Sequence, residues 1–121
     1  MASVRRIVSD RYPYLPIRVN VRRWEIEAYA LIDTGFTGSL AVPSELLNQT
    51  TEMPDSRVRW ALADASIIDA PIYLGDVEIV GFTPIPGISI TFLGEEFVLG
   101  RGIIDRFRVT LDYGRRVIVE K

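Results

Sequence analysis

Apolar and polar residues alternate with a period of two along much of the chain, and this pattern limits the possible folds more than any other feature. The segment from Ile17 to Val21 alternates in this way, and a second alternating segment, from Trp24 to Ile32, follows a turn near Arg22-Arg23. Such alternation is typical of strands that bury one face. The two segments therefore predict an antiparallel hairpin.

More short apolar or alternating segments follow, punctuated by glycine and proline. They predict strands over 40–42, 57–62, 68–73, 77–82, 88–92, 97–100, 109–111 and 117–119. Two brief helices are expected, one over 43–48 with proline in its first turn, and one over 101–107. Short, regularly spaced strands predict a mostly β protein with a small, closed-barrel-like antiparallel fold and one short helix near the C-terminus.

Length and composition predict a single globular domain over 1–121. A chain of 121 residues can bury a core, and its hydrophobic content of 48% argues against disorder. The net charge of −2 gives no reason to expect a nucleic-acid partner. The sequence has no signal-like N-terminus and no apolar run of membrane-spanning length, so we expect a cytoplasmic protein without membrane contact.

The missing residue types narrow the chemistry to carboxylates. The chain has no cysteine and no histidine, which excludes thiol nucleophiles, Ser-His-Asp catalysis and most zinc and non-haem iron sites. The single lysine, Lys121, ends the sequence, so a Schiff-base enzyme is not expected. We therefore expect no metal and no cofactor.

The segment from Leu31 to Gly38 is the candidate site. Asp33 follows an apolar strand, Gly35 and Gly38 allow tight turns, and the Thr34 hydroxyl can bond to nearby backbone groups. One carboxylate alone does little to a peptide bond. Two carboxylates a few ångströms apart share one proton, so that one acts as a base on water and the other as an acid.

The second carboxylate must come from another molecule, because no other aspartate has a matching context. The other aspartates, none of which begins an Asp-Thr-Gly or Asp-Ser-Gly sequence, are Asp10, Asp55, Asp64, Asp69, Asp76, Asp105 and Asp112. A two-fold axis is the closed arrangement that brings identical loops face to face. This predicts a homodimer.

Two motifs together resemble those of the retropepsin-like aspartic proteases, and of small bacterial and cellular members in particular. They are Asp33-Thr34-Gly35 after an apolar strand and Val98-Leu99-Gly100-Arg101 before a short helix. The resemblance covers about residues 15–120. It implies that Asp33 is catalytic, that Thr34 bonds across to the partner loop, and that Gly35 lies beside the substrate backbone. It also implies a psi-shaped support for the site, made by Leu99, Gly100 and Arg101.

A hairpin flap over the substrate is a further implication of the resemblance. The segment 57–73 is in the right place, with Ala63, Asp64 and Ala65 at its tip. Flap tips in the family often contain glycine, where this chain has Ala65. Trp60 is expected to serve in packing.

This chain departs from the family pattern a second time, at a position where the retroviral members carry an acid. Those members place an acid where this chain has Thr37, and the acid pairs with the arginine that corresponds to Arg101. Because Thr37 cannot form that ion pair, we expect Arg101 to cap backbone carbonyls or to reach the other subunit.

The resulting hypothesis is a homodimeric aspartic endopeptidase that cleaves extended, apolar peptide segments with a dyad-activated water. The candidate pocket residues are Phe36, Leu62, Ile68 and Ile85. Two alternatives remain. One is a retropepsin-like peptide-binding or dimerisation module with little or no activity, and the other is a glycosidase-type carboxylate pair that includes Asp33.

Overall fold

The computed structural model describes residues 5–121, so residues 1–4, part of the N-terminal segment considered for targeting, lie outside the described residues. The strands are β1 (Arg6–Ser9), β2 (Tyr14–Val21), β3 (Trp24–Ile32), β4 (Leu40–Val42), β5 (Ser56–Ala61), β6 (Ile67–Ile79), β7 (Ile85–Phe92), β8 (Val98–Leu99), β9 (Arg108–Asp112) and β10 (Arg116–Glu120). The helices are a 3-10 helix, η1 (Ser44–Gln49), and α1 (Arg101–Ile104). Within the described part of the chain, no helix has the length and apolar character needed to cross a membrane.

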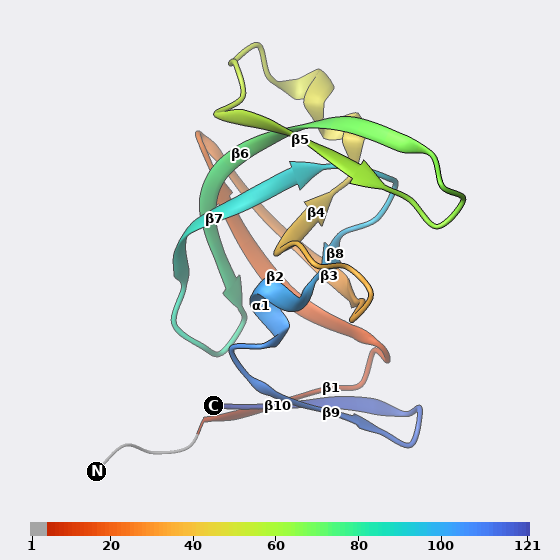
Figure 1. Cartoon of the computed structure of the whole chain (residues 1–121). Helices are drawn as coiled ribbons and strands as arrows, with labels where there is room; N and C mark the ends of the chain where they lie inside the picture. The colour runs from red at the N-terminus through yellow and green to blue at the C-terminus, as the bar shows by residue number, and fades with distance from the viewer. Residues whose placement is uncertain (1–4) are drawn as a thin grey trace.

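Six strands close into a barrel, as Figure 1 shows. Their order is β2-β3-β8-β4-β7-β6, and the antiparallel pairing of β2 with β6 closes the ring. The strand β5 pairs only with the far end of β6 and extends away from the ring as a hairpin. Most pairs are antiparallel, and the β3–β8 and β4–β7 pairs are parallel. The predicted mostly β, closed-barrel fold is confirmed.

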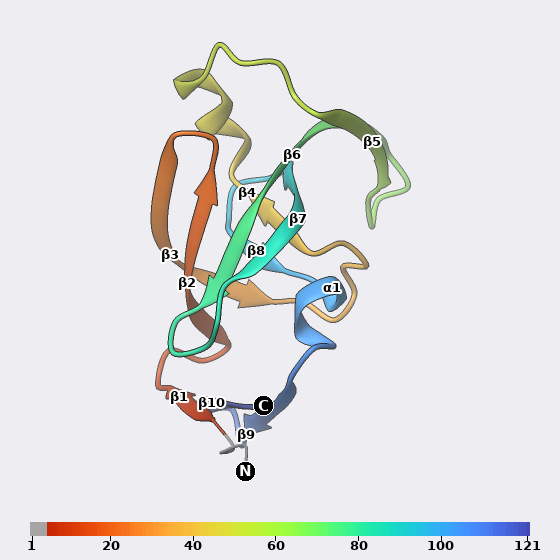
Figure 2. The ribbon, with the colours of Figure 1, turned by 90° about the vertical axis from the view of Figure 1, so that its left-hand side faces the viewer.

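A separate sheet of three strands, in the order β1-β10-β9, lies beneath the barrel (Figure 2). The sequence pattern predicted strands at 109–111 and 117–119, and the structure places both in this sheet. The strand β1 was not predicted. It pairs with β10 from Arg6↔Glu120 to Ser9↔Val117, so the first and last strands of the described chain lie side by side.

The alternating residues of β2 explain why this strand forms. Leu15, Ile17, Val19 and Val21 are at most 1% exposed, while Asn20 on the opposite face is exposed. Burying each such apolar side chain contributes about 1.5–3 kcal/mol relative to leaving it in water. The same core holds Ile103 and Ile104 of α1, which anchor this helix against the barrel.

The long strand β6 corrects two predictions. Strands over 68–73 and 77–82 were expected, but Ile67–Ile79 forms one continuous strand with a bulge between Gly75 and Val77. A β-carbon on Gly75 would lie 2.5 Å from the backbone oxygen of Asn20, so glycine permits a close approach of two strands here. The strand ends at Ile79 because the chain turns at Gly81, whose φ is 108°.

Most other boundaries differ from the prediction by one to three residues, and three of these differences are described here. The first helix is of the 3-10 type and starts one residue later, at Ser44. The helix α1 ends at Ile104 instead of residue 107, because Phe107 turns away to pack against Phe82 with ring centroids 5.0 Å apart. The strand β7 starts at Ile85 instead of residue 88, since Ile85 already pairs with Val77.

Candidate active site

The backbone of Asp33 is fixed by the strand that follows the second motif. Asp33 comes directly after β3, whose last residues run parallel to β8 in the register Leu31↔Val98 and Ile32↔Leu99. The Asp33 N–H donates to the Leu99 carbonyl at 3.0 Å. The backbone of Asp33 is therefore held both by β3, which it follows, and by Leu99, more than sixty residues later in the sequence.

The carboxylate of Asp33 is oriented by its own loop. The Gly35 N–H donates to Asp33 Oδ1 at 2.8 Å, and a β-carbon on Gly35 would lie 3.1 Å from that oxygen. Asp33, Thr34 and Gly35 are all exposed in the single chain. The loop thus presents one oriented carboxylate on the surface of the protomer.

The rest of the loop docks onto the start of α1 through backbone hydrogen bonds. The N–H groups of Gly100, Arg101 and Gly102 donate to the carbonyls of residues 39, 36 and 38 at 3.0, 2.9 and 3.0 Å. A β-carbon on Gly100 would lie 2.7 Å from the Phe36 carbonyl oxygen, so only glycine allows this approach. Leu99, Gly100 and Arg101 therefore lie against the loop.

The side chain of Arg101 takes no part in this docking. It is exposed, and among the described residues no hydrogen bond or ion pair from its guanidinium is present. Its guanidinium therefore caps no carbonyl within the described chain, while its backbone N–H donates to the Phe36 carbonyl. That Arg101 reaches the other subunit stays a prediction. Thr37, at the position where retroviral members carry an acid, is likewise exposed.

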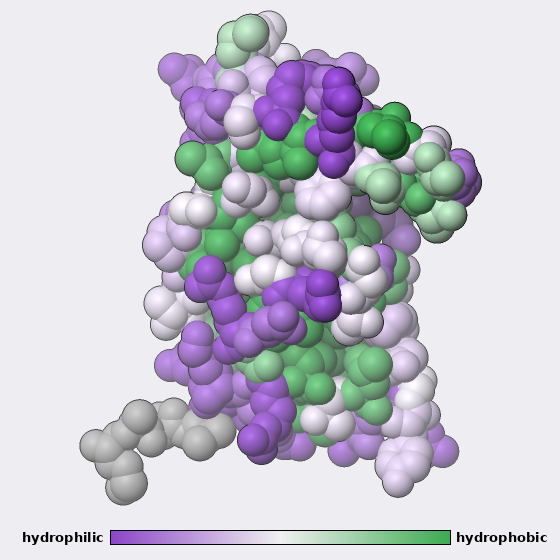
Figure 3. All heavy atoms as spheres, in the orientation of Figure 1, coloured by the Kyte–Doolittle hydropathy of each residue, from purple (hydrophilic) through white to green (hydrophobic). Residues whose placement is uncertain are grey.

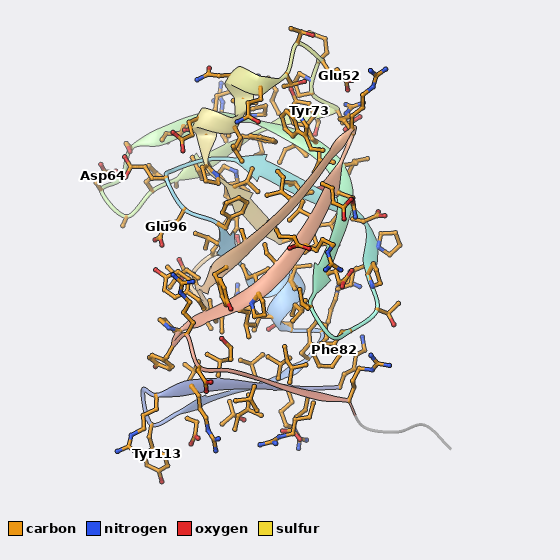
Figure 4. The ribbon with its side chains drawn as sticks, turned by 180° about the vertical axis from the view of Figure 1, so that it is seen from behind. Glu52, Asp64, Tyr73, Phe82, Glu96 and Tyr113 are labelled. Carbon is orange, nitrogen blue, oxygen red and sulfur yellow. The ribbon has the colours of Figure 1, made fainter. Side chains whose placement is uncertain are left out.

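The segment predicted as the flap is an antiparallel hairpin of β5 and the first half of β6. Its pairs run from Ser56↔Ile72 to Ala61↔Ile67. At its tip, the Ala65 N–H donates to the Leu62 carbonyl at 2.9 Å, and Ala65 has a φ of 70°, which favours glycine. Figure 4 shows Asp64 at the far end of the hairpin, away from the barrel.

Asp64 stabilises this tip. Its Oδ1 accepts hydrogen bonds from the hydroxyl and from the N–H of Ser66, the latter at 2.9 Å. The hydroxyl bond and then the backbone bond hold the pKa of the Asp64 carboxyl below its ordinary value of 3.8. Asp64 thus acts in the turn, while Ala63 beside it is exposed.

An aromatic contact joins the hairpin, close to its tip, to the Asp33 loop. The rings of Phe36 and Trp60 are 5.1 Å apart at an interplanar angle of 60°. The Trp60 Nε1–H donates to Thr91 Oγ1 on β7 at 3.1 Å, and Thr91 is 1% exposed. Trp60 does pack, as predicted, but no local sequence signal pointed to Thr91, which lies 31 residues away.

A groove of about 340 Å³ lies between the hairpin and the loop. It is lined by Phe36, Gly38, Ser39, Leu40, Ser56, Arg57, Val58, Trp60, Ile72, Ser89 and Thr91. Of the predicted pocket residues, Phe36 lines this groove and Ile85 does not, because Ile85 lies in the hydrophobic core at 8% exposure. Leu62 and Ile68 lie on the hairpin outside the groove.

The Asp33 loop offers one oriented carboxylate. Within residues 5–121, no three or more His, Cys, Asp or Glu side chains are placed to hold a metal ion. An oriented carboxylate can accept a proton from water, or donate one when it is protonated. Both roles at once require two carboxyl groups.

Comparison with known proteins defines the fold. No protein-family model and no curated protein matches the sequence. The structure is similar to the crystal structure of a retropepsin-like aspartic protease from Rickettsia conorii, with a TM-score of 0.67 and 20% identity, covering 98% of this chain and 92% of that chain. The chain therefore has a retropepsin-like fold, as the two motifs predicted.

Proposed function

We propose that the chain is an aspartic endopeptidase that acts as a homodimer, with Asp33 of each copy forming the catalytic pair. The observation that carries this proposal is that one chain supplies only half of a two-carboxylate site, here called the half-site. One carboxylate is held on a loop that is anchored through Leu99 and Gly100, yet it stands exposed with no second aspartate in a matching loop. A second copy supplies the missing carboxylate and covers the exposed Thr34 and Gly35.

The arrangement of the protomer leaves one side for this second copy. The hairpin ends that carry Asp64 and Tyr113 project on the same side of the molecule (Figure 4), and the loop between β3 and β4 lies on that side as well (Figure 1). Tyr113 is 94% exposed and Leu111 is 51% exposed, so apolar surface is available there. Contact with a two-fold-related copy would bury this surface.

The reaction needs only the two carboxyl groups and water. The ionised carboxylate takes a proton from water as the water oxygen attacks the peptide carbonyl carbon, and the protonated carboxyl donates its proton to the carbonyl oxygen. The tetrahedral product then collapses, the C–N bond breaks, and the nitrogen leaves with a proton from the dyad. This is the established chemistry of aspartic proteases. It requires no cofactor and forms no covalent intermediate.

The hairpin is proposed to cover the substrate. Ile67 and Ile68, next to the tip formed by Ala63, Asp64 and Ala65, are 67% and 38% exposed. Figure 3 shows that the projecting end of the hairpin carries mainly apolar side chains in that view. An extended peptide beneath it would bond to protein backbone in the manner of a strand, beside Gly35.

A peptide-library digest tests the proposal. Asp33→Asn should lower the cleavage rate by about three orders of magnitude, because general acid–base catalysis is lost. Asp76→Asn, at an exposed aspartate on β6, is the matched control and should cleave like the unchanged protein. Cleavage that persists in Asp33→Asn would refute the assignment of Asp33. A lack of cleavage by the unchanged protein throughout the acid and neutral range, with peptide binding retained, would favour the binding module.

A further inference from the structure

We propose that the outer edge of β3 is a docking site for an extended segment of a partner protein in which basic and apolar residues alternate. The inference starts from an open strand edge that runs beside a groove, in a part of the barrel that the proposed catalysis does not use. Glu27 on this edge lies six residues before Asp33. This corresponds to about 20 Å of extended strand, so the edge is distinct from the catalytic loop.

Alternate residues of β3 direct their backbone groups away from β2. In an antiparallel strand, successive residues bond to opposite neighbours. The Ile32 N–H donates to the Pro13 carbonyl on the β2 side at 3.1 Å, whereas the Leu31 N–H donates to the Phe97 carbonyl on the other side at 2.8 Å. By the same alternation, the residues that face this other side earlier in the strand are Glu25, Glu27 and Tyr29. Within residues 5–121 their backbone N–H and C=O groups have no backbone partner, because β8 pairs only with Leu31 and Ile32.

A groove of about 550 Å³ lies along this open edge. In Figure 2 the β2–β3 hairpin forms one flank of the barrel, and η1 lies above its turn. The apolar lining comes from both sides, with Trp24 and Ile26 of β3 facing Leu46 of η1 and Phe97, and all four side chains are half-buried. A segment that paired with β3 would place every second side chain on this apolar surface, because side chains on one face of neighbouring strands contact one another.

The outer side of the groove is acidic. Glu25 and Glu27 line it and are exposed, and Glu27 pairs with Arg18 at 2.9 Å, whereas Glu25 has no ion pair in the described chain. Two further exposed acids adjoin the apolar residues of the other wall in sequence, Glu45 and Glu96. Arg23, next to the turn, is the one base among the described lining residues. The alternate side chains that point outward from a docked segment therefore meet negative charge, which favours basic residues.

The charges also decide against other pairings. If the same edge of a second copy docked here, its Glu25 and Glu27 would lie opposite the same acids, and like charges on paired strands are destabilising. Another open edge of the sheet, along β5, carries the exposed Arg57 and Arg59. A basic segment is therefore expected to bind β3 and not β5.

Two short blocked peptides test the inference, one that alternates valine with arginine and one that alternates valine with glutamate. Both are added to protein with the Asp33→Asn change, so that only binding is recorded. Calorimetry should show about tenfold tighter binding of the arginine peptide, from two or more favourable charge pairs. At saturation, this peptide should slow amide exchange at Glu25 and Glu27, while Ile26, whose N–H faces β2, should be unaffected.

Two changes at Glu27 separate the backbone edge from the charge. Glu27→Pro removes the outward N–H without removing a bond to β2. Glu27→Gln is its matched control, because it loses the same charge and the pair with Arg18 but keeps the N–H. With folding checked by circular dichroism, the proline variant should bind the arginine peptide about tenfold more weakly than the glutamine variant.

Glu25→Lys tests the charge without altering the backbone, at an exposed position. It should reverse the preference between the two peptides. The inference is overturned if folded Glu25→Lys still prefers the arginine peptide, or if that peptide at millimolar concentration leaves exchange at Glu25 and Glu27 unchanged. Protection of β5 in place of β3 would overturn it as well. Because these readouts record binding alone, they do not depend on whether the chain cleaves peptides.

Discussion

The loop that carries Asp33 and the tip of the hairpin are both exposed turns beside the barrel, but they are held in different ways. The loop is bonded through its backbone to Leu99 and Arg101, far away in the sequence. The described hydrogen bonds of the tip, in contrast, all join residues within 62–66. Long-range bonds fix the loop, while a tip that is held only by local bonds can open without disturbing the barrel. The proposed roles, a loop that meets a second copy and a hairpin that covers the substrate, need this difference.

The contact between Phe36 and Trp60 is where these two regions meet. It joins the loop to β5 at Trp60, which pairs with Ile68 and lies next to the last residue pair before the tip, Ala61↔Ile67. The strand just before the tip is thus tied to the loop, while the tip itself carries the positive φ of Ala65 and the Asp64 turn. The contrast between the two regions leads to the predictions that follow, which are ordered from the largest expected effect to the smallest.

The largest effect is expected for Gly100→Ala, at the point where the loop docks. The new β-carbon would collide with backbone oxygens of residues 36 and 38, which cannot move cheaply. We expect the free energy of unfolding to fall by about 3 kcal/mol, measured by denaturant titration. Gly114→Ala, in open space at a φ of 71°, should cost only the backbone strain of about 1 kcal/mol. Equal losses for the two variants would argue against tight docking.

A double-mutant cycle measures the link between loop and hairpin. Replacing Phe36 and Trp60 by leucine, singly and together, should give a coupling free energy of about 1 kcal/mol, as for other aromatic pairs. The pair Phe36 and Trp24 serves as a control, because Trp24 instead packs against Phe92, with ring centroids 5.9 Å apart. A coupling near zero for Phe36 and Trp60 would mean that the two regions behave independently.

The hydrogen bonds that hold the tip should weaken in acid. Because hydrogen bonds from Ser66 lower the pKa of folded Asp64, their stabilising effect is complete above its ordinary pKa of 3.8 and is lost as the pH falls through the lower value. Amide exchange at Ser66 should therefore accelerate at low pH relative to that at Arg101. Asp64→Asn should remove this pH dependence. A pH dependence that persists in this variant would assign the effect to another group.

The smallest effect is expected for Ala65→Gly. Glycine relieves the strain at a φ of 70° but adds freedom to the unfolded chain, so the two terms nearly cancel and stability should change by less than about 0.5 kcal/mol. Amide exchange at the tip reports any added mobility. A stabilisation above 1 kcal/mol, on the order of the full strain term, would show that the unfolded-state term is negligible.

Much of this architecture could be predicted from local patterns. The alternation over 17–21 and 24–32 identified the first hairpin, because each strand buries one face. The position of Asp33 after an apolar strand, with Gly35 and the segment 98–101, located the candidate loop and its support. These features depend on neighbouring residues or on a short motif.

The features that the sequence did not predict depend on distant contacts. The continuity of β6 through Gly75 follows from the approach of Asn20, 55 residues earlier, and the bond from Trp60 to Thr91 joins two different strands. The strand β1 forms because it pairs with β10 at the other end of the sequence. The periodicity of a single segment gives no information about which distant segment it contacts.

The most direct test of the half-site is a mixing experiment. Unchanged and Asp33→Asn chains are refolded together in varying proportions at a fixed total concentration, and the cleavage rate is measured against the unchanged fraction. If each active site needs Asp33 from two copies, the rate follows the square of that fraction. A rate that is directly proportional to the unchanged fraction would show that one copy suffices, and would contradict the account.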